Sequence, residues 1–577
     1  MPSGIGIDGL ARLYKKDREE LVMKRRIVAL LLIAVLVVSV LAGCGAKSSK
    51  DSITALFGSE PNTMDPGIMQ TLDGDTYAVH LFEGLARNDH GKFVPGVAKS
   101  WDVSKDLKTY TFHLRDNAKW SDGKAVTAKD FEYTWKRNLS PKTASPYAYI
   151  LYCIQGGQEY NTYSLKEKPT DAEKTTEDAD LKALADKVGV KAIDDKTFEV
   201  TLIAPTSYFI ELAAIHQTFM PVRQDTIEKN GDAWTQTPET YITNGAYVLK
   251  EWKHNDEIDV VKSENYWNKS RVILNEIHFK LMDDDNAALS ATEAGDIDIN
   301  FAHMPSAEIP RIVKEGKATI YPDLSTYFYD FNTKKAPFDN VKVRKAFALA
   351  LDRQYIVDKV TMASQVPTTG WVPFGFPDPI AKKDFRDADP TQYLNKTADA
   401  DSIAKAKQLL SEAGFPDGKG FPEVEFIYNT SEGHKKIAEA VQEQLKQNLG
   451  ITIKLTNMEW AVFVEERNKK NFFFCRDGWG ADYSDPMTML DMWLPTSGNN
   501  NTGWDNAEFN KLIDTAKNSG DEKVRFDAMH KAEKIFLDEM PVLPIYFYTK
   551  TIMEPKNLKG QYKNPAGVYF LDTAYFE

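Results

Sequence analysis

One cysteine near the N-terminus stands in a pattern typical of covalent lipid attachment. Cys44 follows Leu41-Ala42-Gly43, whose small residues let a signal peptidase approach the backbone while the thiol takes up the lipid. Three cations, at 24–26, precede an apolar run over 27–42 that is shorter than the about 20 residues of a membrane-spanning helix. We therefore expect a lipoprotein signal peptide over 23–43, a diacylglycerol (palmitate) anchor on Cys44 and a polar tether over 44–51.

Residues 1–22 precede the charged region and fit no part of a signal. We expect that translation starts at Met23, because Arg18-Glu19-Glu20 can be encoded by a purine-rich stretch like a ribosome-binding site. A genuine cytoplasmic extension is the alternative.

Motifs of catalysis are missing from the rest of the chain. It has no His-Glu-x-x-His, no Gly-x-Ser-x-Gly, no Gly-x-x-x-x-Gly-Lys and no Cys-x-x-Cys. The nine histidines are scattered, although a zinc site assembled from distant residues stays open. This profile favours a binding protein over an enzyme, with no metal and no cofactor.

Composition narrows the class further. A chain of 577 residues predicts three or four domains or lobes. The net charge of −13 argues against nucleic acid as the main partner. Beyond Cys44 only Cys153 and Cys475 remain, so a disulfide scaffold is excluded. These two could pair, but we favour two buried free thiols.

Local patterns mix strands with helices. Alternating residues predict a half-buried strand over 108–115, and Thr127 with Asp130 predicts a capping box that opens a helix through Arg137. Other expected elements are a strand over 198–202, a helix from Asp339 to about Val360, a helix through Leu410 that ends at Gly414, a charged surface insertion with some helix over 166–187 and a long surface loop over 371–392.

One stretch predicts a βαβ unit. Residues 423–429 form an expected strand, 434–449 a helix ended by Gly450, and 451–455 a second strand. Such a unit makes part of the sheet parallel, so we expect an α/β protein with mixed sheets.

Several segments, in order along the chain, resemble the peptide-binding branch of the extracellular solute-binding proteins, family 5, which serve ABC importers. The similar segments are Gly58-Ser59-Glu60-Pro61-Asn62-Thr63-Met64-Asp65-Pro66, Leu81-Phe82-Glu83-Gly84-Leu85, Pro95-Gly96-Val97-Ala98-Lys99-Ser100-Trp101, Trp120-Ser121-Asp122-Gly123, Asn244-Gly245-Ala246-Tyr247 and Gly478-Trp479-Gly480-Ala481-Asp482-Tyr483. The resemblance implies a two-lobed periplasmic-binding-protein-like fold of type II, with an accessory domain and a hinge that closes around the ligand.

The resemblance also implies domain boundaries. Lobe I would combine 45–82, 222–324 and 546–577, the accessory domain would cover 83–221, and lobe II would cover 325–545.

A receptor for varied peptides must bind what all peptides share. Asp482 offers a carboxylate for the ligand ammonium, with Trp479 and Tyr483 beside it; an N-cap for the segment after it is the alternative. The resemblance implies that the ligand backbone adds as an extended strand between Gln70–Leu72 and Gly478–Gly480. The same resemblance places Gln70, Thr71, Leu72, Gly478 and Gly480 beside the ligand backbone, mostly through main-chain groups. It places Tyr147, Tyr327, Phe328 and Tyr329 along the cleft, with core packing as the alternative for these four aromatic residues.

For the ligand carboxylate, Arg476 and His434 match family positions that can meet it. Arginine suits a carboxylate through two parallel hydrogen bonds. The alternatives are an ion pair of Arg476 with Asp477 and a surface position for His434.

Two departures from the family pattern matter. Many relatives carry a cysteine pair where this chain has Ser325 and Gly480, so that bridge is lost. A lysine that meets the carboxylates of short ligands is matched by Thr361, which favours longer peptides.

The expected protein is a monomeric, lipid-anchored receptor on the extracytoplasmic face of the cell membrane that delivers oligopeptides to an ABC permease. Alternatives are a same-fold receptor for a nickel chelate, haem, a murein peptide or a sugar, a sensor of peptide signals, and an anchored peptidase.

Overall fold

The computed structural model describes residues 50–301 and 303–577. Residues 1–22, the expected signal peptide, Cys44 and most of the tether lie outside the described residues. Within the described part, no helix combines the length and the apolar character that crossing a bilayer requires.

A mixed sheet joins two groups of strands, in the order β17-β16-β18-β12-β19-β11-β1-β10-β9-β8, with β13 beside β19. In the first group β1 runs parallel to β10 and β11, and in the second group β16 runs parallel to β17 and β18. The other pairs are antiparallel, so the expectation of a mixed sheet is confirmed. The first group consists of β1 (Ser52–Gly58), β8 (Tyr247–Lys253), β9 (Glu257–Lys262), β10 (Glu276–Leu281) and β11 (Ile299–Phe301).

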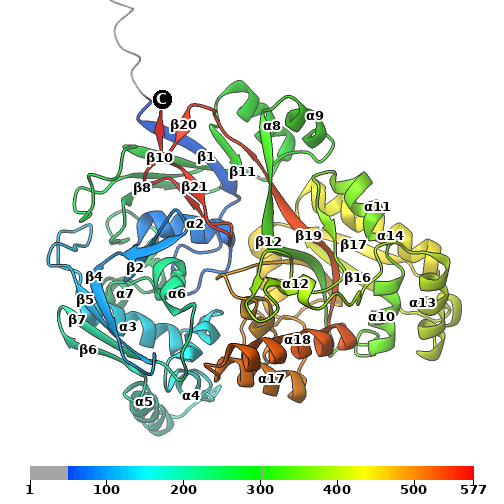
Figure 1. Cartoon of the computed structure of the whole chain (residues 1–577), viewed down its shortest axis with the longest axis horizontal. Coiled ribbons are helices and arrows are strands. Elements are labelled where there is room, and N and C mark those ends of the chain that lie inside the picture. Colours follow the sequence, from blue (N-terminus) through cyan, green and yellow to red (C-terminus); the bar gives the residue numbers. More distant parts are fainter. Residues whose placement is uncertain (1–49, 302) are drawn as a thin grey trace, which may run out of the picture. The chain divides into compact units, whose positions relative to one another are not determined.

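Two long strands connect the groups. β12 (Ala318–Phe331) and β19 (Val542–Met553) pair from Ala318 with Met553 to Asp330 with Val542. β19 also pairs with β11 of the first group, and β12 also pairs with β18 (Phe474–Gly480) of the second group. Figure 1 shows both strands passing between the two groups. The pairing register shifts between Pro322 and Thr326, which places an irregularity near the middle of this connection.

The expected βαβ unit is confirmed. β16 (Val424–Asn429) leads through α14 (Glu432–Leu449) to the parallel β17 (Ile453–Met458). Ser431 caps α14 by accepting a hydrogen bond from the backbone of His434, and Gly450 ends the helix in the left-handed region at φ 72°. Residues at helical spacing bury one face of α14: Ile437, Ala438, Val441, Leu445 and Leu449.

Residues 83–221 contain a separate four-stranded antiparallel sheet, in the order β4-β5-β7-β6. β5 (Thr109–Leu114) buries alternate residues as its sequence predicts, and Thr127 and Asp130 form the expected capping box before α3 (Ala128–Leu139). The remaining elements here are β2 (Ala86–Asp89), β3 (Lys92–Pro95), β4 (Ala98–Val103), β6 (Val190–Asp194), β7 (Thr197–Thr201), η1 (Ala148–Cys153), α4 (Gly157–Asn161), α5 (Asp171–Ala185), α6 (Phe209–Ile215) and η2 (Gln217–Phe219).

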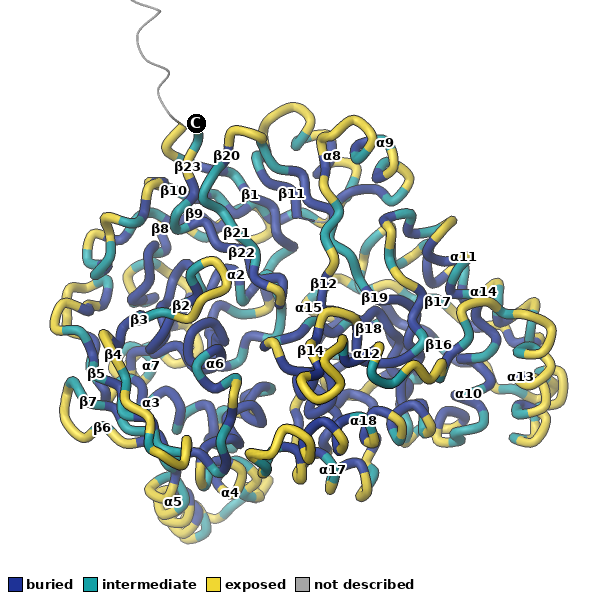
Figure 2. The backbone as a smooth tube through the Cα atoms, viewed as in Figure 1, coloured by how far each residue is buried: buried dark blue, intermediate teal, exposed yellow. Residues whose placement is uncertain are grey.

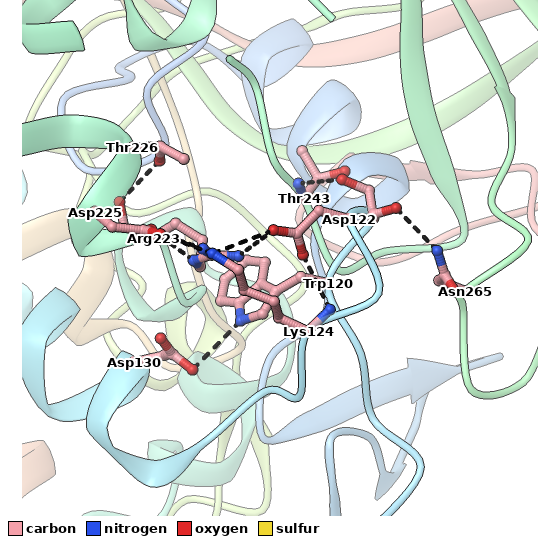
Figure 3. A network of polar contacts seen from close by, with 10 residues as sticks. Trp120, Asp122, Lys124, Asp130, Arg223, Asp225, Thr226, Thr243 and Asn265 are labelled. Atoms are coloured by element: carbon pink, nitrogen blue, oxygen red, sulfur yellow. Dashed lines mark hydrogen bonds and ion pairs between the residues drawn. The ribbon is translucent and has the colours of Figure 1, made fainter. Parts of the chain in front are cut away.

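A buried arginine ties this region to the segment that follows it (Figure 3). Arg223 donates to Asp122 (3.0 Å) and to Asp225 (2.8 Å), and its guanidinium lies 5.7 Å from the ring of Trp120. The Trp120 indole in turn donates to Asp130 (3.4 Å) at the start of α3. The Trp-Ser-Asp-Gly segment found in the sequence therefore has a structural role, because it clamps the small sheet to the chain after residue 221.

Helices precede and follow the strands of both groups along the chain. Those of the second group are α10 (Val341–Leu349), α11 (Arg353–Tyr355), η4 (Ile356–Thr361), α12 (Phe385–Ala388), α13 (Ala400–Glu412), η5 (Pro416–Gly418), α15 (Trp460–Asn468), α16 (Met487–Leu490), η6 (Asp491–Trp493), α17 (Ala507–Lys517) and α18 (Glu522–Glu539). The first group has α2 (Leu72–Leu81), α7 (Gln224–Asn230), η3 (Gly231–Thr235), α8 (Asp285–Ala294) and α9 (Ile309–Lys314). The expected helix ending at Gly414 and the exposed helix within 166–187 correspond to α13 and α5.

The helix expected from Asp339 to Val360 is wrong as a single element. Asn340, not Asp339, caps α10, which ends at Leu349. Asp352 then caps a new turn by accepting from the backbone of Tyr355 (2.8 Å), and this turn continues into the π-helical η4. The break lets Arg353 enter the core, where it donates to the carbonyls of Ala348, Pro544 and Asn395.

The stretch 371–392, expected to be a surface loop, is exposed over 379–383 and 390–392 as predicted, but other parts of it are anchored in the interior. The side chain of Trp371 is fully buried, and the Arg386–Glu533 ion pair beneath it is also buried. Glu533 of α18 accepts from the backbone amides of Trp371 and Val372 (2.9 Å each). The turn-forming residues correctly predict an irregular backbone, but they do not indicate which parts of that backbone are buried. Short strands occur here and before it: β13 (Val366–Pro367), β14 (Pro377–Asp378) and β15 (Lys383–Asp384).

The C-terminal residues return to the first strand group. Leu571 donates its backbone amide to the ring of His80 (3.0 Å), Tyr562 donates to the carbonyl of Asn88 (2.7 Å), and Arg271 pairs with Asp572 (2.8 Å). This segment forms two small antiparallel pairs, β20 (Leu558–Lys559) with β23 (Tyr575–Phe576) and β21 (Tyr562–Lys563) with β22 (Tyr569–Phe570).

Buried backbone follows both strand groups, while α5 and α13 carry much exposed surface (Figure 2). Cys153 and Cys475 are buried free thiols, which confirms the favoured expectation.

Candidate functional site

Strand β18 and the turn after it carry the charged residues singled out by the sequence. Arg476 lies opposite Tyr329 of β12, Gly478 opposite Tyr327 and Gly480 opposite Ser325. Because side chains alternate along a strand, these positions share the less buried face of β18. β16 pairs with β18 only at Phe474 and Cys475. Beyond these two residues, one edge of β18 therefore has no partner strand in the described part of the chain.

Arg476 has no carboxylate partner among the described residues. Its guanidinium donates to the Tyr548 hydroxyl (3.0 Å) and lies 5.3 Å from the ring of Tyr327. The alternative of an ion pair with Asp477 is wrong, because Asp477 points to the other face and pairs with Arg467 (2.8 Å). A cation held against tyrosines in this way can accept an anionic ligand without first breaking an internal ion pair.

His434 lies beside Arg476 at the start of α14. Its Nδ1 contacts the Tyr327 hydroxyl at 3.2 Å, so it is not the surface residue of the alternative. Burial, together with the nearby Arg476 cation, holds the pKa of His434 well below its usual value. At neutral pH the ring is therefore uncharged and acts as a hydrogen-bonding group.

A cavity of about 360 Å³ opens next to Arg476 and His434. Pockets of roughly 300–1,000 Å³ are the usual size for small ligands. One wall comes from the ends of β1 and α2 and the segment before α8, and the other from α14, β18 and β19. Thr361 also lines it, with its hydroxyl donating to Gln365 (2.8 Å).

Asp482 lies past the end of β18 and outside the lining of this cavity. It accepts from the Tyr147 hydroxyl (3.2 Å) and from the Thr488 hydroxyl (3.4 Å), and it forms no ion pair among the described residues. Burial, with Asp491 nearby, raises the pKa of Asp482 well above its usual value. The N-cap alternative is wrong, because Asp485 accepts from the backbone of Met487 at the next helix.

The aromatic residues expected around the ligand have different positions. The ring of Tyr147 lies 6.0 Å from Trp479, and Tyr483 stacks on Tyr208 at 4.2 Å. Phe328 does not lie with Tyr327 and Tyr329 as expected. Because neighbouring side chains of a strand alternate, Phe328 points to the opposite face of β12, where its ring lies 4.9 Å from that of the buried Trp371.

Tyr327 and Tyr329 are both fully buried on the Arg476 face. Tyr327 contacts His434, as described above, whereas Tyr329 packs on Phe426, 4.2 Å between ring centroids. Neither ring lines the cavity, and only Tyr327 contacts the lining residues Arg476 and His434.

Gln70, Thr71 and Leu72 approach from the other side. Gln70 donates to Asn499 (3.0 Å) and accepts from Asn468 (3.0 Å), both in the second half of the chain. Thr71 caps α2, and Leu72 lines the cavity. Further contacts between the halves join Ser484 to Glu211 (2.9 Å) and Tyr147 to Asp482, so this structure is in a closed arrangement.

Several cavity residues were missed in the sequence. Asp73, Asp283, Asp285, Tyr548 and Lys550 all line the cavity. They come from segments far apart in the chain and match no motif, so only the folded structure brings them together.

One cluster of possible metal ligands exists among the described residues: Glu257, Asp259 and His278, on neighbouring strands β9 and β10. Lys280 already pairs with Glu257 (2.6 Å), and none of these residues lines the cavity. The cluster is satisfied as an ion-pair network on the sheet.

The comparison with known proteins agrees with this architecture. The model of the bacterial extracellular solute-binding proteins, family 5, matches residues 92–501, and the chain belongs to this family of two-lobed binding proteins. The oligopeptide-binding protein OppA of Bacillus subtilis is 37% identical over 577 residues, covering 96% of this chain and 100% of its own. The periplasmic oligopeptide-binding protein OppA of Salmonella typhimurium is 36% identical over 504 residues, 87% of this chain and 88% of its own.

Solved structures extend the comparison. Haemophilus influenzae OppA in complex with the peptide RPPGFSPFR superposes with a TM-score of 0.81, at 32% identity over 91% of this chain and 99% of its own. The Escherichia coli murein tripeptide-binding protein MppA gives 0.82, at 34% identity over 92% and 99%. An unliganded open form of MppA gives only 0.58, at 35% identity over 92% and 98%. The lower value is consistent with the contacts between the halves described above.

Proposed function

We propose that this protein captures oligopeptides between its two lobes and delivers them to an ABC importer. The ligand ammonium binds Asp482, the ligand carboxylate binds Arg476 with His434, and the backbone adds along the free edge of β18 as an extra strand. Lobe I combines 45–82, 222–324 and 546–577, the accessory domain covers 83–221, and lobe II covers 325–545. These boundaries would fall within β12 and β19, beside the register shift near Pro322.

One observation carries this proposal. Arg476 lies in β18 and Asp482 six positions later, in the bend just past the end of that strand, and neither has an oppositely charged partner among the described residues. An extended chain advances about 3.3 Å per residue, so the four steps of β18 from Arg476 to Gly480 alone span roughly 13 Å. That distance suits the two ends of a short peptide and not those of a single amino acid.

The backbone between these charges supports the added strand. Gly478 and Gly480 present no side chains to the free edge of β18, so a ligand backbone can approach closely. A larger residue would not fit at position 478, because a Cβ added to Gly478 would lie 2.8 Å from the Tyr548 hydroxyl. Main-chain pairing of this kind is independent of ligand sequence, which a receptor for varied peptides needs.

The location follows from the N-terminal pattern. Cys44 carries the lipid, so the monomeric protein is anchored at the extracytoplasmic face of the cell membrane beside its permease. Labelling with a palmitate analogue tests this: wild-type protein takes up label and Cys44→Ala does not. Label that persists in the variant contradicts the anchor.

Calorimetry with matched peptides tests the ligand. We expect a free tetrapeptide to bind, and its N-acetylated and C-amidated forms to bind at least tenfold more weakly, because each loses one charged end. Mass spectrometry after incubation adds a second readout, since a receptor returns the peptide intact whereas a peptidase cleaves it. Equal affinity for all three forms would refute both assigned ends, and binding of a nickel chelate, haem or sugar in preference to any peptide would refute the ligand class.

A further inference from the structure

The cavity beside Arg476 has an acidic wall that peptide capture alone does not require. Asp73, Asp283 and Asp285 line it, and none of them is paired with a lysine or arginine among the described residues. Asp283 accepts a hydrogen bond from Ser59, and Asp285 lies 3.8 Å from the Nδ1 atom of His303. None of the polar contacts of these three carboxylates is with a lysine or arginine, so no fixed cation in the described part of the chain neutralises the wall.

Asp73 and Asp285 stand in the first turns of α2 and α8, but neither of them caps its helix. Asp284 alone caps α8, because its Oδ1 accepts from the backbone amides of Asn286 and Ala287 (2.9 Å each). Burial, followed by the charges of Glu432 and Asp284, raises the pKa of Asp285 to about 6. Glu432 lies in the first turn of α14, where it pairs with Lys436 of the same helix (3.4 Å).

Across the cavity from Asp283 and Asp285 stands Arg476, which has no carboxylate partner among the described residues. Lys550 of β19 is engaged elsewhere, since its ammonium lies 5.5 Å from the ring of Phe301 and makes a long ion pair with Asp323 (3.7 Å). Under the proposed function this side receives the ligand carboxylate. A residue whose carboxylate reaches Arg476 must place its own side chain within the same cavity, which at about 360 Å³ has room for a long side chain.

We propose that this cavity selects peptides that end in lysine or arginine, whose side-chain cation binds Asp283 and Asp285 while the terminal carboxylate binds Arg476. This inference rests on the proposed function and specifies the class of peptide. Charge complementarity on both sides gives discrimination, because a neutral side chain leaves the acidic wall unpaired and an acidic one adds repulsion.

Calorimetry with three tetrapeptides tests it: Ala-Ala-Ala-Lys, Ala-Ala-Ala-norleucine and Ala-Ala-Ala-Glu. Norleucine keeps the length of lysine without its charge. We expect the lysine peptide to bind at least tenfold more tightly than the norleucine peptide, and the glutamate peptide to bind weakest. In Asp283→Asn and in Asp285→Asn the lysine advantage should fall to threefold or less, while affinity for the norleucine peptide stays within twofold, which also reports an intact fold.

Asp232→Asn is the matched control, since it removes one charge from an exposed position outside the cavity and should leave the lysine advantage unchanged. Equal binding of the lysine and norleucine peptides by the wild type overturns the inference but leaves peptide capture standing. A lysine advantage that persists in both cavity variants also overturns it. If none of the three peptides binds, the proposed function itself fails, and this inference fails with it.

Discussion

Replacing Asp482 with asparagine should weaken ligand binding and stabilise the unliganded protein at the same time. The carboxylate is held by two hydroxyl groups, from Tyr147 and Thr488, but faces no cation among the described residues. Removing one partner of a buried charge pair costs about 2–5 kcal/mol. At about 1.4 kcal/mol per tenfold, affinity for a tetrapeptide should fall roughly 30-fold to 4,000-fold.

The stability effect has the opposite sign. The pKa of Asp482 is raised in the folded protein above its unfolded value near 3.8. Between these two pKa values the folded protein holds a proton that the unfolded chain has lost, so the free energy of unfolding falls as pH rises through that window. Above it the folded state carries an uncompensated charge. Asparagine removes this charge, and we expect a gain of about 0.5–2 kcal/mol, or roughly 0.5–2 °C in Tm, that is largest at high pH.

Scanning calorimetry at pH 5 and pH 8, on protein freed of ligand by unfolding and refolding, measures this gain, and titration calorimetry measures the affinity. Asp477→Asn, on the preceding strand β18, is the matched control, because it loses the ion pair with Arg467 and should lower Tm. A lower Tm for Asp482→Asn at pH 8, or peptide affinity within threefold of the wild type, would refute the assignment of Asp482 as an unpaired charge that awaits the ligand.

Three further predictions follow from specific contacts. Ser325→Cys with Gly480→Cys should form a disulfide, because the two positions face each other across β12 and β18 and a Cβ on Gly480 would lie 3.1 Å from the Ser325 hydroxyl; thiol titration after air oxidation that still finds both new thiols would contradict this. Glu533→Ala should lower the free energy of unfolding by about 3–5 kcal/mol, since it leaves Arg386 buried without its partner, and a loss below 1 kcal/mol in urea denaturation would disagree. Arg476→Met should remove the preference for a free over an amidated peptide C-terminus, and a preference that survives in calorimetry would place the carboxylate elsewhere.

Elements with strong periodicity could be predicted from the sequence. β5 and the βαβ unit around α14 were predicted because burial alternates every two residues in one and at helical spacing in the other. The helix around α10 was predicted too long, since helix propensity continues through Leu351 while Asp352 and the inward turn of Arg353 end it. Arg353 donates hydrogen bonds to carbonyls that are distant in the sequence, such as that of Pro544, so no local sequence pattern could predict them.

The site divides in the same way. Arg476 and Asp482 were found because they stand in a segment that resembles a family, yet the absence of an internal partner for either became visible only in the fold. The acidic wall of the cavity was not predicted, because Asp73 and Asp285 are separated by more than 200 positions and each matches an ordinary helix-start acid. Spatial convergence of common residue types leaves no trace in a single sequence.

The order in which strands lie in the main sheet differs from the order in which they are synthesised. β1, the first strand, lies between β10 and β11, and the last residues of the chain hold α2 through His80. A chain growing from the ribosome, or emerging from a translocation pore, therefore cannot complete this half until Leu571 has emerged. The stretch 325–545 is continuous and faces no such delay. A truncated product that lacks the C-terminal twenty residues would thus retain one half and lose the other, and such a fragment would be open to proteolysis before it could occupy a permease.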